Sequence, residues 1–224
     1  MKKTKLIVFD IDGTLIDSVS AYHEVVISAM KEMGITTIDT NFNDLKHHTD
    51  SYAFKVNYEK NFDTSFSFEL LDKFEKLLVK YLQQHPDTVA IEGANAMLEA
   101  LEHSEYAFAF ATGSLPESAL WKMNKAGLVI DEQLLATSKT SLSREGFVKE
   151  AIEKAKKYFD VHEFEQIISI GDGLWDLKTA QNLKLEFLGI GEKNKAVMSQ
   201  HGMKRHIVDW EGITVAWLMD IQQS

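Results

Sequence analysis

Two aspartates, Asp10 and Asp12, stand directly after the apolar run at residues 6–9, and Gly13 follows them. Four apolar residues in a row predict a buried parallel strand, and ligands bind in open α/β sheets outside the C-terminal ends of such strands. A carboxylate at that place can attack phosphorus or an activated carbon and form a covalent intermediate. A second carboxylate can protonate the leaving oxygen and later accept a proton from water. Because Asp-Gly is also a common turn dipeptide, the pair alone is equally compatible with an ordinary turn.

A second polar group follows the apolar run at residues 106–111 and consists of Thr112, Gly113 and Ser114. A hydroxyl group and nearby backbone N–H groups can bind phosphate oxygens, and a glycine allows the backbone to approach a ligand closely. These residues are therefore candidates for substrate contact, although such a tripeptide is also typical of a simple loop.

A third group comes after the apolar run at residues 167–170, where Asp172 and Asp176 lie four positions apart. Hard divalent cations such as Mg²⁺ prefer oxygen ligands. If these two acids meet Asp10 and Asp12 at one edge of a sheet, the four carboxylates repel each other and any anionic substrate. A bound cation would offset that repulsion, so the composition of the edge favours a metal site. Asp176 alone also fits the acidic first turn of a helix.

The string at residues 10–18, Asp-Ile-Asp-Gly-Thr-Leu-Ile-Asp-Ser, resembles the first motif of the haloacid dehalogenase superfamily. The later groups follow in the order that this family uses. The resemblance implies that Asp10 is the nucleophile, that Asp12 is the general acid and base, and that Thr112 binds the phosphoryl group. It also implies a Mg²⁺ site made by Asp10, the backbone carbonyl of Asp12, and Asp172, with Asp176 as a further ligand or an orienting group.

The family also places a cation before or at the start of a later helix, most often as a lysine followed by proline, and this chain lacks that pair. Arg144 is our first choice for this cation because a helix is expected to begin there. Lys139 is the second choice. Either side chain would add a positive contact to the phosphoryl oxygens.

Strand-like apolar runs alternate with helical patterns along the chain, at about residues 5–10, 106–111, 133–137, 166–171, 185–190 and 206–208. This alternation predicts an α/β fold, with a parallel sheet covered by helices on both faces. The resembled family has the same architecture, a Rossmann-like core.

Roughly ninety residues separate the first two strands, far more than one crossover needs. We expect residues 16–88 to form a small all-helical cap, while residues 1–15 and 89–224 form the catalytic core. Helical apolar faces run over residues 19–33 and 68–82.

The stretch between these two faces, at about residues 37–61, is less regular. The insert resembles the α-helical cap class of the superfamily, whose caps close over small soluble substrates and supply specificity. Lys46 and His48 are cap candidates for substrate contact, although a plain polar surface is the more common explanation for each of them taken singly.

Composition narrows the functional classes. The chain of 224 residues is 45% hydrophobic, has no cysteine, and carries a net charge of −10. The absence of cysteine fits a reducing cytoplasm, and the negative charge disfavours nucleic-acid binding. No stretch approaches the length of a membrane span, and the apolar run after the N-terminal lysines is too short for a signal peptide. The oligomeric state cannot be inferred.

The sequence thus predicts a cytoplasmic, Mg²⁺-dependent phosphatase that acts on small phosphorylated metabolites. A sugar-phosphate mutase of the same superfamily is the main alternative, and His23 lies one position from the place of a histidine found in those mutases. A non-catalytic binding protein on this fold is a further alternative, which the missing Lys-Pro pair favours. Dehalogenase activity is disfavoured, because dehalogenases of this family lack the second aspartate, which Asp12 supplies here.

Overall fold

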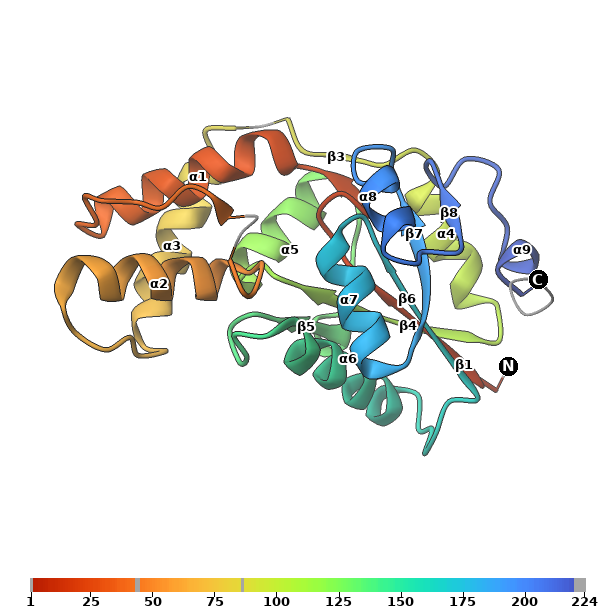
Figure 1. The fold of residues 1–224 in the computed structure, drawn as a ribbon. Coiled ribbons are helices and arrows are strands. Elements are labelled where there is room, and N and C mark those ends of the chain that lie inside the picture. The colour runs from red at the N-terminus through yellow and green to blue at the C-terminus, as the bar shows by residue number, and fades with distance from the viewer. Residues whose placement is uncertain (1, 43–44, 86, 220–224) are drawn as a thin grey trace.

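The computed structural model describes residues 2–42, 45–85 and 87–219. Within them lies a parallel six-stranded sheet with the strand order β5-β4-β1-β6-β7-β8 (Figure 1). The strands of this sheet are β1 (Lys5–Phe9), β4 (Tyr106–Thr112), β5 (Leu135–Thr137), β6 (Gln166–Gly171), β7 (Glu186–Ile190) and β8 (His206–Ile207). The predicted α/β fold with a Rossmann-like sheet is confirmed.

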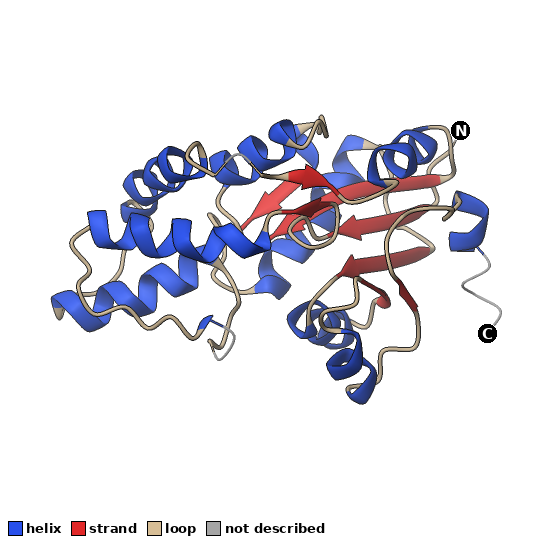
Figure 2. Ribbon diagram, turned by 90° about the horizontal axis from the view of Figure 1, so that it is seen from above, coloured by secondary structure: helices blue, strands red, loops and turns tan. Residues whose placement is uncertain are grey.

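Helices connect the strands and lie on both sides of the sheet (Figure 2). Those that follow the first motif are α1 (Val19–Glu32), α2 (Asp50–Phe62) and α3 (Leu70–Leu82). The later ones are α4 (Ala94–Glu102), α5 (Pro116–Lys125), the 3₁₀ turn η2 (Glu132–Leu134), α6 (Arg144–Tyr158), α7 (Leu174–Leu183), α8 (Lys195–Gln200) and α9 (Val215–Met219). In the described part of the chain, no helix has the length and apolar character needed to cross a membrane.

The register of the sheet brings the three motif-bearing strands to one edge. In β1, Phe9 pairs with Phe110 of β4 on one side and with Ile170 of β6 on the other. The residues that follow these strands therefore leave the sheet side by side. Asp10, whose amide donates to the carbonyl of Ile170 at 2.9 Å, is the first of them.

The helices α1, α2 and α3 form a separate hydrophobic cluster beside this end of the sheet (Figure 1). Among the residues that the structure describes, Leu115, at the start of α5, is the one buried member of that cluster outside residues 16–88. A two-stranded antiparallel ribbon of β2 (Ile16–Asp17) and β3 (Val89–Ala90) joins the two ends of the insert. We call residues 16–88 the cap, and its exact limits stay a prediction.

Two details of the cap differ from the sequence-based expectation. The stretch expected to be irregular contains α2, which begins after Thr49, whose side chain accepts a hydrogen bond from the amide of Tyr52. The other is Phe68, which was assigned to the apolar face of the last cap helix but precedes α3 and is 45% exposed.

The cap and the core meet along a seam in which backbone groups take part. The amide of Asp50 donates to the carbonyl of Gly113 at 2.9 Å. The hydroxyl of Ser51 donates to the carbonyl of Ser138 at 2.6 Å. The guanidinium of Arg144 donates to the carbonyl of His48 at 3.2 Å. Residues of α2 and the turn before it are thereby joined to the loops after β4 and β5 and to the start of α6.

Candidate active site

Asp10 lies at the end of β1 against the side chain of Arg144. The guanidinium NH2 of Arg144 donates to Oδ1 of Asp10 at 2.8 Å and also to Oδ1 of Asp176. Arg144 is only 5% exposed and starts α6, where the hydroxyl of Ser143 caps the helix by accepting from the amide of Gly146. Burial, followed by the negative charge of Asp176, raises the pKa of Asp10 well above its usual range. The positive charge of Arg144 opposes that rise, so it offsets part of the negative charge of Asp10 and Asp176.

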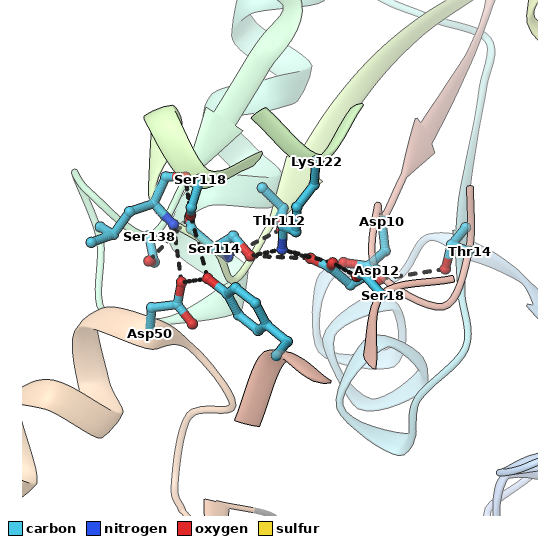
Figure 3. Close-up of polar contacts among 12 residues, drawn as sticks. Asp10, Asp12, Thr14, Ser18, Asp50, Thr112, Ser114, Ser118, Lys122 and Ser138 are labelled. Carbon is cyan, nitrogen blue, oxygen red and sulfur yellow. Dashed lines mark hydrogen bonds and ion pairs between the residues drawn. The ribbon is translucent and has the colours of Figure 1, made fainter. Parts of the chain in front are cut away.

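Asp12 has a cation of its own, Lys122, on α5 (Figure 3). The ammonium group of Lys122 lies 2.7 Å from Oδ1 and 2.6 Å from Oδ2 of Asp12. Ser114 donates to Oδ2 at 3.1 Å, and the hydroxyl of Ser18 donates to Oδ1. Burial by itself would raise the pKa of Asp12, but the charge and hydrogen bonds of Lys122 and the two serines hold it below its usual value.

Asp172 completes an acidic cluster with Asp10 and Asp176. One oxygen from each of these carboxylates lies within 4.8 Å of the others. Burial, and then the charge of Asp176, raises the pKa of Asp172 to about 7. Across residues 2–42, 45–85 and 87–219, no lysine or arginine forms an ion pair with Asp172. An oxygen-rich, under-compensated cluster of this kind fits a hard divalent cation.

The loop after β4 forms the other wall. Thr112 is buried, and its hydroxyl accepts from the amide of Ser114 at 3.1 Å, which fixes the turn. A side chain at Gly113 would put a Cβ atom 2.8 Å from the carbonyl oxygen of His48 and 3.1 Å from a nitrogen of Arg144. The absence of a side chain there allows the loop to approach the cap closely.

A cavity of about 390 Å³ opens over these groups, between the core and the cap. Its floor is polar and contains the four residues predicted as catalytic, Asp10, Asp12, Thr112 and Arg144, together with Asp172. Its other walls are largely apolar and come from both parts of the molecule, namely Val26, Phe42, Leu45, Ala53, Leu174, Trp175 and Val197. Lys178 and Lys193 also line it.

Comparison with known proteins assigns this arrangement to a family. A profile for haloacid dehalogenase-like hydrolases matches residues 7–190, which span every motif described above. The chain belongs to this family. A search of curated proteins found no match.

Solved structures share the fold of this hydrolase at low sequence identity. A hydrolase of family IA, variant 3, from Entamoeba histolytica is 19% identical with a TM-score of 0.70, over 98% of this chain and 100% of that one. A predicted phosphoglycolate phosphatase from Haemophilus somnus is 18% identical with a TM-score of 0.60, over the whole of both chains. A β-phosphoglucomutase from Clostridium difficile is 15% identical with a TM-score of 0.67, over 98% and 96%.

The two candidates for the cation of the third motif occupy different places in this hydrolase. Arg144 contacts Asp10, whereas Lys139 points to the cap and pairs with Asp72 at 2.5 Å and Glu75 at 2.9 Å. The choice of Lys139 as a cation for the phosphoryl group, or as a substrate contact, is therefore unsupported by its position. Lys139 instead fastens the loop after β5 to α3.

The two cap residues predicted as substrate contacts, Lys46 and His48, also lie in different places. His48 lines the cavity, but Lys46 is exposed and does not. The imidazole of His48 stacks on Trp175 at 3.8 Å between ring centroids, and its Nδ1 donates to the carbonyl of Phe42 at 3.2 Å. Burial, followed by the charge of Arg144, lowers the pKa of His48 to about 4. At neutral pH this ring is uncharged. It can therefore contact a substrate through its surface and one polar edge, but it contributes no positive charge.

Lys122 and Tyr22 are two residues of this site whose roles sequence reasoning missed, and the cavity residues Lys178 and Lys193 were not predicted either. The ammonium of Lys122 lies 3.8 Å from the centroid of the Tyr22 ring, whose hydroxyl donates to Asp50. Tyr22 was expected only as part of an apolar helix face. The available signal for Lys122 was its place on the inner face of α5, between the buried residues Ala119 and Met123.

Proposed function

We propose that this hydrolase is a Mg²⁺-dependent phosphatase that cleaves phosphate monoesters of small metabolites through an aspartyl-phosphate intermediate. The observation that carries the proposal is the place of Arg144, which lines the cavity and bonds Asp10. Within the described ranges, its buried Nε has no hydrogen-bond partner. A guanidinium that lines the cavity beside a nucleophilic carboxylate suits phosphoryl oxygens, which arginine binds through several donors at once.

In the first half of the reaction, a carboxylate oxygen of Asp10 attacks phosphorus. The bond between phosphorus and the ester oxygen breaks, and its electron pair stays on that oxygen, which takes a proton from Asp12. Because Asp12 is ionised beside Lys122 in the free protein, it must take up this proton as the anionic substrate binds. Arg144 and the loop of Thr112 hold the remaining phosphoryl oxygens as charge shifts among them. The alcohol leaves, and Asp10 carries the phosphoryl group.

In the second half, Asp12 accepts a proton from a water molecule, which attacks the same phosphorus. The bond from phosphorus to the Asp10 oxygen breaks, inorganic phosphate is released, and both carboxyl groups return to their starting states. The apolar walls contributed by the cap would limit the access of bulk water to the first half.

Mg²⁺ would be held by the carboxylates of Asp10 and Asp172 and by the backbone carbonyl of Asp12, and it would neutralise charge on the phosphoryl group. Both oxygens of Asp176 are already engaged, since one accepts from Arg144 and the other from the amide of Gly173 at 3.1 Å. We therefore assign Asp176 an orienting role.

Phosphate release from a panel of phosphorylated metabolites tests the proposal, measured with Mg²⁺ and with EDTA. Asp10→Asn should lower turnover at least ~10³-fold, as the loss of a covalent nucleophile does in other enzymes. Asp160→Asn, which changes an exposed aspartate after α6, is the matched control. A folded Asp10→Asn variant with normal activity would exclude this mechanism, and release that persists in EDTA would exclude the metal.

A sugar-phosphate mutase is the second candidate, supported by the shared fold of the β-phosphoglucomutase named above and by His23, which lines the cavity. Both activities share the first half of the reaction and differ in whether water or a sugar hydroxyl takes the phosphoryl group. Phosphorus NMR of incubated sugar phosphates separates them: free phosphate supports the phosphatase, and an isomeric ester supports the mutase.

A further inference from the structure

Lys122 is the most deeply buried charged residue of the site, with a side chain that is 0% exposed. Its ammonium group donates to both oxygens of Asp12 and to the hydroxyl oxygen of Ser114 at 2.8 Å, and it lies over the ring of Tyr22. Three groups, from the loop after β1, the loop after β4 and α1, therefore surround one charge. No step proposed above uses this lysine.

Stability alone does not account for a lysine at this position. Lys122 lies on the inner face of α5 beside the buried Met123, where an aliphatic side chain of similar length would fill the same space. A buried ion pair is often no more stabilising than well-packed apolar residues, because both charges lose their hydration. The effect of the Lys122–Asp12 ion pair on the Asp12 side chain is therefore the question to ask.

The contacts of Asp12 indicate what effect Lys122 has on this carboxylate. Ser18 bonds only Oδ1 and Ser114 bonds only Oδ2, whereas Lys122 bonds both oxygens. Such a two-oxygen contact fixes the direction of the carboxylate. Figure 3 shows the ammonium of Lys122 between Asp12 and Ser114.

Lys122 does not itself line the cavity, although Asp12 and Ser114 do. A phosphoryl group or leaving group in the cavity would meet the carboxylate of Asp12 and not the ammonium behind it. Any effect of Lys122 on the reaction must then pass through Asp12.

We infer that Lys122 is a positioning residue, which fixes the direction of the Asp12 side chain so that, once Asp12 has taken up a proton with the substrate, this proton faces the leaving oxygen. This inference rests on the proposed function. It predicts that Lys122 matters in proportion to how much the leaving group needs a proton. An alkoxide must be protonated as it leaves, whereas the p-nitrophenolate ion leaves without help.

The test compares kcat/KM for an alkyl phosphate and for p-nitrophenyl phosphate, since this constant reports the steps up to the departure of the leaving group. Lys122→Met should lose ~10²-fold on the alkyl ester, the lower range of general acid catalysis. On p-nitrophenyl phosphate it should lose less than about threefold, which also verifies that the fold and Asp10 are intact. Lys125→Met, an exposed lysine of the same helix, is the control and should match the wild type on both esters.

A double variant separates positioning from a structural role. If Lys122 acts through Asp12, Asp12→Asn combined with Lys122→Met should be no slower on the alkyl ester than Asp12→Asn alone. This variant removes both charges of the pair, so it keeps the test decisive if the single Lys122→Met protein fails to fold. Losses that multiply, or equal losses on both esters, would overturn the inference.

The proposed function fails at a different point of the same experiment. A wild-type protein that cleaves neither ester, or an active Asp10→Asn variant, would overturn the phosphatase mechanism and this inference together. An active wild type whose Lys122→Met variant is unchanged on the alkyl ester would overturn the inference alone.

Discussion

The site contains two buried cations, Arg144 at the start of α6 and Lys122 within α5, and each bonds a different carboxylate of the first motif. Arg144 lines the cavity and retains a buried donor without a partner among the residues described. Lys122 lies behind the cavity wall, and Asp12, Ser114 and the ring of Tyr22 surround its ammonium group.

This difference separates two uses of a buried positive charge. A cation that lines the cavity is available to a ligand, and under the proposed function that ligand is the phosphoryl group. A cation whose contacts are all internal can only orient its neighbours. The two halves of the site should therefore respond differently when the leaving group of the substrate is changed.

The largest effect is expected at Arg144. Arg144→Gln should reduce kcat/KM by roughly 10²–10³, the loss seen when one donor to a developing oxyanion is removed. The reduction should be similar for alkyl and aryl phosphates, because both present the same phosphoryl oxygens. Steady-state kinetics with both esters measures this.

Lys139→Gln is the matched control for that variant, since Lys139 pairs with the cap residues Asp72 and Glu75. It should change kcat/KM by less than about twofold, as is usual for partly exposed ion pairs. A larger loss for Lys139→Gln than for Arg144→Gln would return the role of the third-motif cation to Lys139. A loss at Arg144 that depends on the leaving group would remove the distinction between the two cations.

An intermediate effect is expected at Tyr22, which covers the ammonium of Lys122 from the cap. Tyr22→Leu should lower kcat/KM for an alkyl phosphate about tenfold, because a desolvated cation loses its contact with an aromatic face. Tyr22→Phe keeps the ring and should stay near the wild-type rate. If both variants lose equally, the hydroxyl that bonds Asp50 matters and the ring does not.

The smallest effect is one of stability and concerns Asp172, a carboxylate with which neither of these two cations forms an ion pair. Its pKa of about 7 in the folded protein exceeds the ordinary value of 3.8, so the folded state binds this proton more tightly than the unfolded state does. Stability from this group is full below pH 3.8 and is lost as the pH rises toward 7. Asp172→Asn should therefore unfold at a higher temperature than the wild type in EDTA at pH 8, and at a similar temperature at pH 4.

A gain of about 1 kcal/mol corresponds to roughly 2–4 °C in Tm for a domain of this size. Thermal unfolding followed by circular dichroism measures this shift. Mg²⁺ should raise the Tm of the wild type and leave that of Asp172→Asn unchanged. A variant that is less stable than the wild type at pH 8 would contradict the assignment of Asp172 as an uncompensated charge.

The sheet and the motif residues could be predicted because each motif directly follows an apolar run. The order of the runs gives the strands, and the parallel register then places Asp10, Thr112 and Asp172 at one edge. Arg144 could be predicted for a similar reason, since Ser143 before it is a good helix cap.

Lys122 could not be assigned in the same way, because its partner Asp12 lies 110 residues earlier in the chain. A lysine in an amphipathic helix is usually solvated. Only the spacing of Lys122 from Leu115 and Ala119 indicated that it lies on the inner face of α5. The helix α2 was missed because its inner face includes polar residues. Asn57 there is buried and accepts from the amide of Asp39 at 2.6 Å, so it packs without the apolar pattern that reveals a helix.

The seam between cap and core has a consequence for how such a protein can diverge. Main-chain atoms of the cap take part at two of its points, the carbonyl of His48 and the amide of Asp50. A mutation changes a side chain and leaves those atoms in place. The two main-chain groups therefore stay available when the side chains of His48 and Asp50, which line the cavity, are replaced, so part of the docking of the cap is independent of the side chains that would select a substrate.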